Sequence, residues 1–254
     1  PYCIVAMGTT AETAPMTPQE QQDVLRCIIN TNSGRLPLVL GAGCNDTAAL
    51  VARIRNISPD EVSAVLSVAP YYNKPSQEGL YAHFAEIAKA SPVPVILYNI
   101  PSRTGVNMLP GTILRLARDF GNIAGVKEAS GSMEQAMRII KERPEGFAVY
   151  SGDDALGVPM TLMGGQGVIS VLANSHPAAC SAMIKHALGG RIKEALEIHY
   201  RFLDYISLLF CEGNPTGVKA AMSLMGKCCP HVRLPLVKAS EGLMSSLSQV
   251  LDKL

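Results

Sequence analysis

The sequence predicts an α/β protein with a parallel sheet, arranged as a (β/α)8 barrel of the TIM type. Three observations support this fold class. The 254 residues match the length of a single barrel, which is about 250 residues. Short apolar runs alternate with helical patterns, an order that requires parallel strands and right-handed crossovers. Unusual polar residues follow the apolar runs, where the strands of a barrel converge on one mouth.

Seven apolar runs are the predicted strands. Continuous short runs of this kind are typical of strands that are buried on both faces of a sheet. They are Tyr2–Met7, Leu36–Leu40, Val62–Val68, Val93–Tyr98, Ile123–Lys127, Phe147–Ser151 and Gly167–Val171. A barrel needs eight strands, so we expect the first β/α unit to be missing from this chain and to precede Pro1 in a longer protein.

The helices between these strands have readable starts. Thr17 combines an N-cap position with Pro18 at the first helical position and with a capping-box glutamate, Glu20. Asp46 and Ser76 are the predicted caps of the next two helices. Each start follows a predicted strand, as the β-α order requires.

The pattern changes after the seventh strand, and no further strand is predicted. One long helix is expected, with an apolar stripe formed by Ile192, Leu196, His199, Leu203, Ile206 and Phe210. Two more helices are predicted near Pro215–Met225 and Leu236–Leu254. We therefore divide the chain into a barrel at residues 1–190, lacking its first β/α unit, and a C-terminal helical region at residues 191–254.

An open doubly wound sheet is the competing architecture. A dinucleotide-binding sheet of that kind carries a GxGxxG turn, which Gly41–Asp46 does not complete. The polar residues after the strands favour the barrel, because in an open sheet only those near the switch point would meet. They are Thr9-Thr10, Asn45, Tyr71-Tyr72-Asn73, Tyr98-Asn99, Arg103, Lys127-Glu128, Asp153-Asp154 and Asn174.

Charge, cysteine and histidine content narrow the function. Lys and Arg total 22 against 21 for Asp and Glu, a balance that argues against a dedicated nucleic-acid or anionic-membrane surface. Charges or prolines interrupt every apolar run before membrane-spanning length. The seven cysteines are odd in number and irregular in spacing, which favours free thiols in a reducing cytoplasm over a disulfide framework. No histidine or acidic cluster has metal-ligand spacing, so no metal is predicted.

Lys127 is the sharpest catalytic candidate. It ends an apolar strand, and burial favours the neutral amine that forms a Schiff base with a carbonyl. The alternative is a lysine that reaches solvent or pairs with Glu128. Tyr98 ends the preceding strand and offers a phenol that can relay a proton, although packing is the commoner role for a lone aromatic residue.

Thr9, Thr10 and Arg103 are the candidate groups for binding a carboxylate. The two threonines offer hydroxyls and successive backbone N–H groups, and the arginine offers a bidentate fork. Ordinary turn chemistry and a solvated loop arginine are the competing explanations. No GxSxG nucleophile elbow is present, so a metal-independent reaction through a lysine imine is the most economical prediction.

Several segments match one family in order and spacing over essentially the whole chain. They are Gly8–Glu12, Pro70–Gly79, Leu97–Gly105, Gly125–Ala129, Ser151–Asp154, Gly167–Val171 and Asn214-Pro215. With them the chain resembles the dihydrodipicolinate synthase family of the pyruvate-dependent class I aldolase/lyase superfamily. The resemblance implies condensation of pyruvate with aspartate 4-semialdehyde to 4-hydroxy-tetrahydrodipicolinate, on the route to diaminopimelate and lysine. It also implies a homo-oligomer, expected as a dimer of dimers, and no cofactor beyond the covalent imine.

The resemblance also assigns catalytic roles. Lys127 would form the imine with pyruvate. Tyr98, Thr9 and Tyr72 would form a proton relay, with Tyr72 reaching into the site of the neighbouring subunit. For Tyr71, simple interface packing is the preferred role.

The same resemblance assigns the substrate contacts. Thr10 would help to bind the pyruvate carboxylate, and Arg103 would bind the carboxylate of the semialdehyde. The backbones of Gly152 and Ile169 would line the pocket.

The chain departs from the family at its lysine-feedback site. Asn45 and Tyr71 match that site, but Pro18 and Gln21 stand at its two histidine positions, and Ala49 stands at its glutamate position. A bound lysine would lose the carboxylate partner of its ammonium group, a loss on the order of 1–3 kcal/mol. We therefore predict weak or absent inhibition by lysine.

Two alternatives remain at this point. A sister lyase, such as N-acetylneuraminate lyase or a 2-keto-3-deoxy sugar acid aldolase, would share Lys127 and Tyr98 but typically has Ser in place of Thr9 and lacks the Arg103 and double-tyrosine signature. An inactive fragment or a small-molecule sensor of the same fold is the other alternative. The presence of every catalytic side chain argues against an evolved pseudoenzyme.

Overall fold

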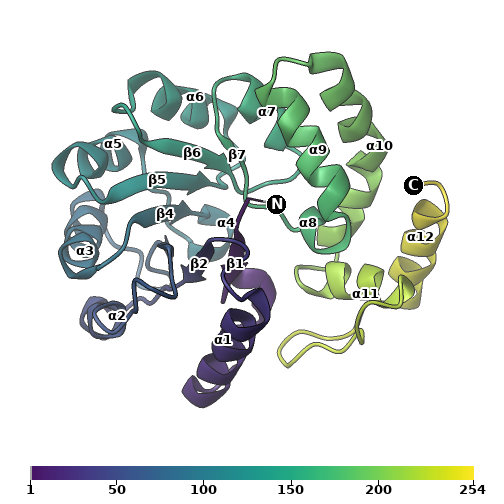
Figure 1. Cartoon of the computed structure of the whole chain (residues 1–254), viewed down its shortest axis with the longest axis horizontal. Coiled ribbons are helices and arrows are strands. Elements are labelled where there is room, and N and C mark those ends of the chain that lie inside the picture. Colours follow the sequence, from purple (N-terminus) through teal and green to yellow (C-terminus); the bar gives the residue numbers. More distant parts are fainter. Residues whose placement is uncertain (1) are drawn as a thin grey trace.

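The computed structural model describes residues 2–254 and shows a curled, half-barrel sheet of seven parallel strands with helices on its outer side (Figure 1). Each strand pairs in parallel with the next one in the chain, from β1 to β7. The strands are β1 Ile4–Ala6, β2 Leu38–Gly41, β3 Ala64–Val68, β4 Val95–Asn99, β5 Ile123–Glu128, β6 Ala148–Ser151 and β7 Gly167–Val168. All seven predicted strands are confirmed. The expectation that a first β/α unit is missing from this chain stays a prediction.

The last strand is shorter than predicted, and the reason is a turn. β7 ends at Val168, whereas the apolar run continues to Val171. The backbone N–H groups of Val171 and Leu172 both donate to the buried carboxylate of Asp154, at 2.9 and 3.0 Å. These bonds hold the chain in a turn at Val171, where α8 begins, so the apolar run does not continue as a strand.

The predicted helix starts are confirmed by their caps. The Thr17 hydroxyl accepts from the Glu20 N–H at 3.3 Å, and the Glu20 carboxylate accepts from the Thr17 N–H at 2.8 Å. Asp46 and Ser76 cap the next two helices through their side chains. The helices up to the end of the sheet are α1 Pro18–Asn32, α2 Thr47–Ile54, α3 Gln77–Ala90, α4 Pro101–Thr104, α5 Pro110–Asp119, α6 Met133–Glu142 and α7 Gly157–Leu162.

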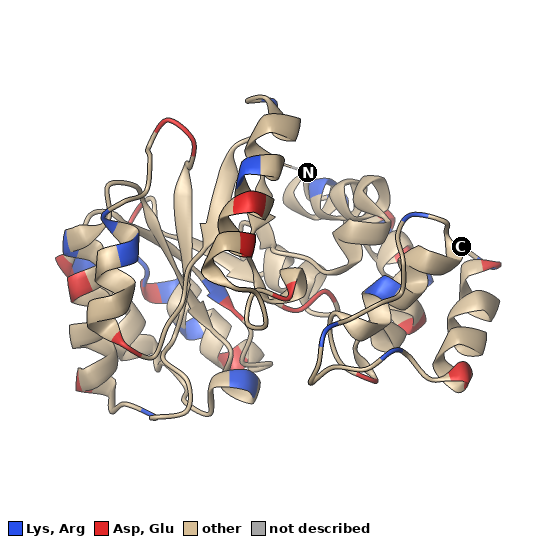
Figure 2. Ribbon diagram, turned by 90° about the horizontal axis from the view of Figure 1, so that it is seen from below, with Lys and Arg blue, Asp and Glu red and all other residues tan. Residues whose placement is uncertain are grey.

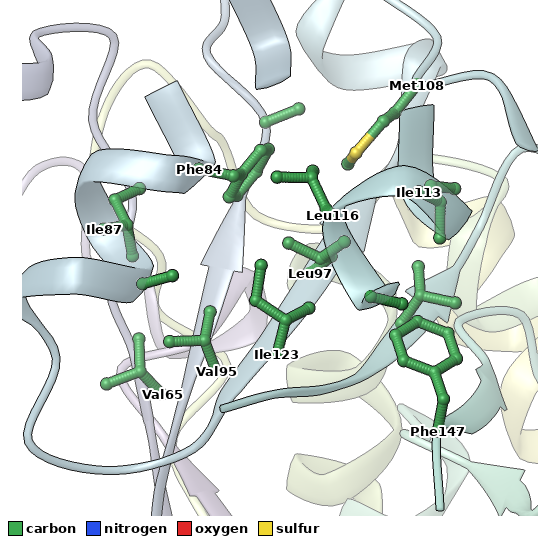
Figure 3. Packing of buried hydrophobic residues seen from close by; sticks show 14 of the residues in the cluster. Val65, Phe84, Ile87, Val95, Leu97, Met108, Ile113, Leu116, Ile123 and Phe147 are labelled. Carbon is green, nitrogen blue, oxygen red and sulfur yellow. The ribbon is translucent and has the colours of Figure 1, made fainter. Parts of the chain in front are cut away.

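The two faces of the sheet have separate cores, because successive side chains of a strand point to opposite faces. Val95 and Leu97 of β4 pack outward against the helices, among residues such as Phe84 and Leu116 (Figure 3). The inner face carries a smaller cluster that includes Tyr98. This alternation decides which polar residues reach the barrel interior.

Helices α8 Leu172–Ser175, α9 Pro177–Leu188, α10 Ile192–Phe210, α11 Thr216–Leu224 and α12 Glu241–Leu251 complete the chain. The three helices predicted in the C-terminal region are confirmed. They share one core with α7, α8 and α9, and the domain boundary at 190/191 stays a prediction. None of the helices in residues 2–254 combines the length and the apolar character needed to cross a membrane.

The predicted apolar stripe of α10 is partly wrong. Ile192 and Phe210 are 52% and 37% exposed, whereas Phe202, Tyr205 and Leu209 are buried. The buried face is therefore rotated around the helix, because α10 lies against α9 on one side and α11 and α12 on the other. Basic and acidic residues are interspersed on the outer helices, in keeping with the balanced charge (Figure 2).

Candidate active site

Lys127 and Tyr98 lie side by side on the inner face of the half-barrel. They are paired in the register of β4 and β5, and the Lys127 Nζ atom lies 4.2 Å from the centroid of the Tyr98 ring. Both side chains are buried, at 9% and 6% exposure. Lys127 and Tyr98, which were predicted as catalytic candidates on separate strands, thus lie together, with a buried amine against a buried phenol ring.

The electrostatic surroundings of Lys127 favour its neutral form. Burial lowers the pKa of Lys127 to about 8, the nearby Asp154 carboxylate opposes this shift, and the Arg103 guanidinium adds to it. An amine with this pKa is neutral in an appreciable fraction of molecules near pH 7. Neutral amines are the nucleophiles of Schiff-base chemistry.

Tyr98 is arranged to keep its proton. Burial raises the pKa of Tyr98, while a hydrogen bond with the Thr9 side chain and the charge of Arg103 lower it. The phenol is therefore protonated near neutral pH and is linked to a second hydroxyl. Thr9 begins a short 3-10 helix, Thr9–Ala11, in the loop that follows β1. Thr9 is thus linked to the Tyr98 hydroxyl, and the Lys127 amine lies over the ring of the same tyrosine.

Thr10 and Arg103 are joined by a residue from the far end of the sequence. The Asn214 side-chain amide donates to the Thr10 hydroxyl at 2.9 Å, and the Arg103 guanidinium donates to the Asn214 backbone carbonyl at 3.4 Å. Asn214 is buried, and its Oδ1 atom has no partner among residues 2–254. The sequence reasoning gave Asn214 no role, and only its place in the Asn-Pro motif marked it.

The backbones of Gly152 and Ile169 reach the same place. The Gly152 N–H donates to the Glu128 carbonyl at 2.8 Å, and the Ile169 N–H donates to the Ser151 carbonyl at 2.9 Å. A Cβ at Gly152 would lie 2.9 Å from the Lys127 Cε atom. The same Cβ would lie 2.6 Å from the Ala129 Cβ atom, so glycine leaves room here both for Ala129 and for the lysine stem.

Tyr72 is not brought to this site within the chain. It is 86% exposed, and its backbone has a left-handed φ of 73°. Its neighbour Tyr71 is 42% exposed. The predicted role of Tyr72 in the site of a neighbouring subunit therefore stays a prediction.

Asp154 has a role that the sequence reasoning missed. It is only 1% exposed, and its Oδ2 atom accepts the N–H groups that turn the chain after β7. Burial raises the pKa of Asp154, whereas the Ser170 hydroxyl and the two N–H groups lower it. Its charge also acts on Lys127. In the sequence, the only indication of this role was the position of the Asp153-Asp154 pair directly after a predicted strand.

Two residues expected at the mouth lie elsewhere. Asn99 and Glu128 each follow a predicted strand directly, but both belong to the strands and are buried on the helix side of the sheet, at 0% and 1% exposure. The one-residue step from Tyr98 and Lys127 reverses the direction of the side chain. No three His, Cys, Asp or Glu side chains of residues 2–254 come close enough to hold a metal ion.

Comparison with known proteins identifies relatives of the whole chain. The model of the dihydrodipicolinate synthetase family matches residues 2–254. The 4-hydroxy-tetrahydrodipicolinate synthase of Flavobacterium psychrophilum is 48% identical over 244 residues, which cover 96% of this chain and 83% of the relative. The dihydrodipicolinate synthase of Aquifex aeolicus has a similar structure, with a TM-score of 0.95, 39% identity, and coverage of 99% of this chain and 86% of the other. A dihydrodipicolinate synthase variant described as monomeric is also similar, with a TM-score of 0.95 and 35% identity over 98% and 84% of the two chains. The chain therefore belongs to the dihydrodipicolinate synthetase family.

Proposed function

We propose that this chain is a lyase that condenses pyruvate with aspartate 4-semialdehyde to 4-hydroxy-tetrahydrodipicolinate, in the biosynthesis of diaminopimelate and lysine. The observation that carries the proposal is the buried Lys127 amine, with a pKa of about 8, against the Tyr98 phenol. Family membership and the names of the relatives support the same activity.

The proposed reaction begins on Lys127. The neutral amine attacks the ketone carbon of pyruvate, and loss of water leaves a covalent imine. Removal of a proton from the methyl carbon then gives an enamine, whose carbon attacks the aldehyde of the second substrate. Each step moves a proton, and Tyr98 with Thr9 supplies a reversible proton carrier beside the lysine.

The proposed substrate contacts use the loops around this pair. Thr10, with the backbones of Gly152 and Ile169, binds the pyruvate end. Arg103 binds the semialdehyde carboxylate through its guanidinium group. The Asn214 contacts support this assignment because they hold Thr10 and Arg103 against one another.

We further propose a homo-oligomer, a dimer of dimers, in which Tyr72 completes the proton relay of the neighbouring subunit. Its high exposure and left-handed backbone support an outward role for this side chain. No cofactor is proposed besides the imine on Lys127. The cytoplasmic location is also a proposal, supported by seven free cysteines, which suit a reducing compartment.

Borohydride trapping with pyruvate tests the chemistry. The protein is incubated with pyruvate, reduced, digested and mapped by mass spectrometry. A reduced pyruvyl adduct is expected on Lys127 and is lost in Lys127→Ala, whereas Lys89→Ala on the exposed face of α3 serves as the matched control. A folded protein that forms no adduct on Lys127 would overturn the proposal.

A substrate panel separates the alternatives. Aspartate 4-semialdehyde is offered with pyruvate beside N-acetylneuraminate and 2-keto-3-deoxy sugar acids. Because the chain has Thr9 and Arg103, we expect it to turn over aspartate 4-semialdehyde with pyruvate and none of the sugar acids. Cleavage of the sugar acids would favour a sister lyase, and imine formation without turnover of any substrate would favour a sensor or an inactive fragment.

A further inference from the structure

Two buried polar side chains lie directly behind the catalytic pair. Asn99 and Glu128 pair with each other in the register next to Tyr98 and Lys127. The inner-face pair faces the barrel interior, and the outer-face pair faces the helices, because strand side chains alternate. The same two strand ends therefore carry one polar pair on each face.

The Glu128 carboxylate is held by three neutral N–H donors. Its Oε1 atom accepts from the Ser130 backbone at 2.7 Å, and its Oε2 atom accepts from the side chains of Asn99 and Gln135, both at 3.0 Å. A buried carboxylate is tolerated only when its oxygens are satisfied. These bonds therefore tie β5 to β4 and to α6.

The same network reaches the segment before α5. The Asn99 amide also donates to the Asn107 side chain at 2.8 Å and accepts the Met108 N–H at 2.9 Å. The Asn107 amide donates to Gln135 at 2.9 Å. Strands β4 and β5, helix α6 and the segment before α5 thus meet at the buried side chains of Asn99, Glu128 and Gln135 and the partly buried side chain of Asn107.

The backbone continues this connection on the catalytic side. The Ala129 N–H donates to the Asn99 carbonyl, and the Gly152 N–H donates to the Glu128 carbonyl, both at 2.8 Å. The network residues therefore fix the Glu128–Ala129 peptide group, one residue beyond Lys127, on both sides, together with the start of the loop at Gly152 that lies against the lysine stem.

We propose that Glu128 and Asn99 are positioning residues, which lock the ends of β4 and β5 so that the Lys127 amine and the Tyr98 phenol keep their productive separation. This inference rests on the proposed function. The action is geometric, since the charges that act on Lys127 are those of Asp154 and Arg103, not that of Glu128.

Glu128→Gln tests the proposal with almost no change of shape. Its amide must point at the Ser130 N–H or at the Asn99 and Gln135 amides, and donor then faces donor. We expect kcat to fall by about tenfold or more, because small displacements of the reacting groups lower the rate strongly. KM for pyruvate should change by less than about twofold, and the pH midpoint of imine formation should stay in place.

The matched control is Glu134→Gln, one residue before Gln135 on α6, where the exposed carboxylate pairs with Arg138. It should keep full activity. Each rate is divided by the concentration of active sites, which is measured as the amount of Lys127 adduct that borohydride traps after long incubation with pyruvate. Unfolded protein then does not lower the apparent kcat. If Glu128→Gln does not fold, Gln135→Met, which removes one donor from outside the strands, is judged by the same measurements.

The outcomes are distinct. A loss of kcat at an unchanged pH midpoint supports the proposal. Full kcat in the folded variant overturns it, and so does a loss that a shifted pH midpoint explains entirely. If the unsubstituted protein itself forms no pyruvyl adduct, the proposed function has failed, rather than the positioning role alone.

Discussion

The pKa of Lys127 sets the pH dependence of imine formation. At a pKa of about 8, about one amine in ten is neutral at pH 7, against about one in three thousand at the ordinary value of 10.5. Burial therefore raises the reactive fraction by roughly 300-fold. The perturbation that we choose is Asp154→Asn, which removes the charge that raises this pKa and keeps an acceptor for the N–H groups of Val171 and Leu172.

The assay is the rate of imine formation from pH 6 to pH 10, quenched with borohydride. The unsubstituted protein should show a rate that climbs about tenfold per pH unit and levels off above pH 8. Asp154→Asn should move this midpoint to lower pH, because the protonated amine has lost an attractive charge. Asp153→Asn, at the neighbouring and less buried position, should leave the midpoint in place. A rate that still climbs steeply above pH 9.5, or a midpoint that Asp154→Asn moves to higher pH, would refute the reasoning.

Three further predictions concern crowding, acid stability and feedback. Gly152→Ala places a methyl 2.9 Å from the Lys127 stem and should lower the imine rate by about tenfold, whereas Gly111→Ala, with open space around it, should match the unsubstituted protein. Burial raises the pKa of Glu12, but its ion pair with α11 and a backbone N–H donor outweigh burial and lower the pKa on balance. As pH falls, the unfolded state then binds more protons than the folded state. The unsubstituted protein should therefore have a higher Tm than Glu12→Gln, with the full difference above about pH 5 and a smaller one at lower pH. A Tm difference that does not change with pH would contradict this. Lysine titrated into the assay should inhibit weakly or not at all, because Ala49 offers no carboxylate, and a tight cooperative curve would be the contrary result.

The sequence predicted what depends on neighbouring residues. Strand positions follow from short apolar runs, and the Thr17 capping box is a local hydrogen-bond pattern, so both could be read from a few residues. The pairing of Tyr98 with Lys127 was foreseen because parallel strands place their ends together. These predictions needed only order and periodicity.

What could not be predicted depends on one-residue precision or on distant contacts. Glu128 was expected at the mouth, but a single step along β5 turns its side chain to the helices. The buried face of α10 depends on which helices pack against it, and a lone helix does not specify this. The contact between Asn214 and Thr10 joins residues 204 positions apart, and the Asn-Pro motif that marked Asn214 gave no indication of its partner.

That long-range contact has a consequence for the order of assembly. The loop after β1 is anchored by Asn214 on Thr10 and by Lys219 on Glu12, partners 204 and 207 positions later in the chain. During synthesis the strands that carry Tyr98 and Lys127 emerge and can pair well before those anchors exist. The amine and phenol can therefore be assembled early, while the carboxylate-binding loop gains its final shape only when the last helices dock. The pair that carries out the covalent chemistry, Lys127 and Tyr98, would then form earlier during synthesis than the loop that binds the substrate carboxylate.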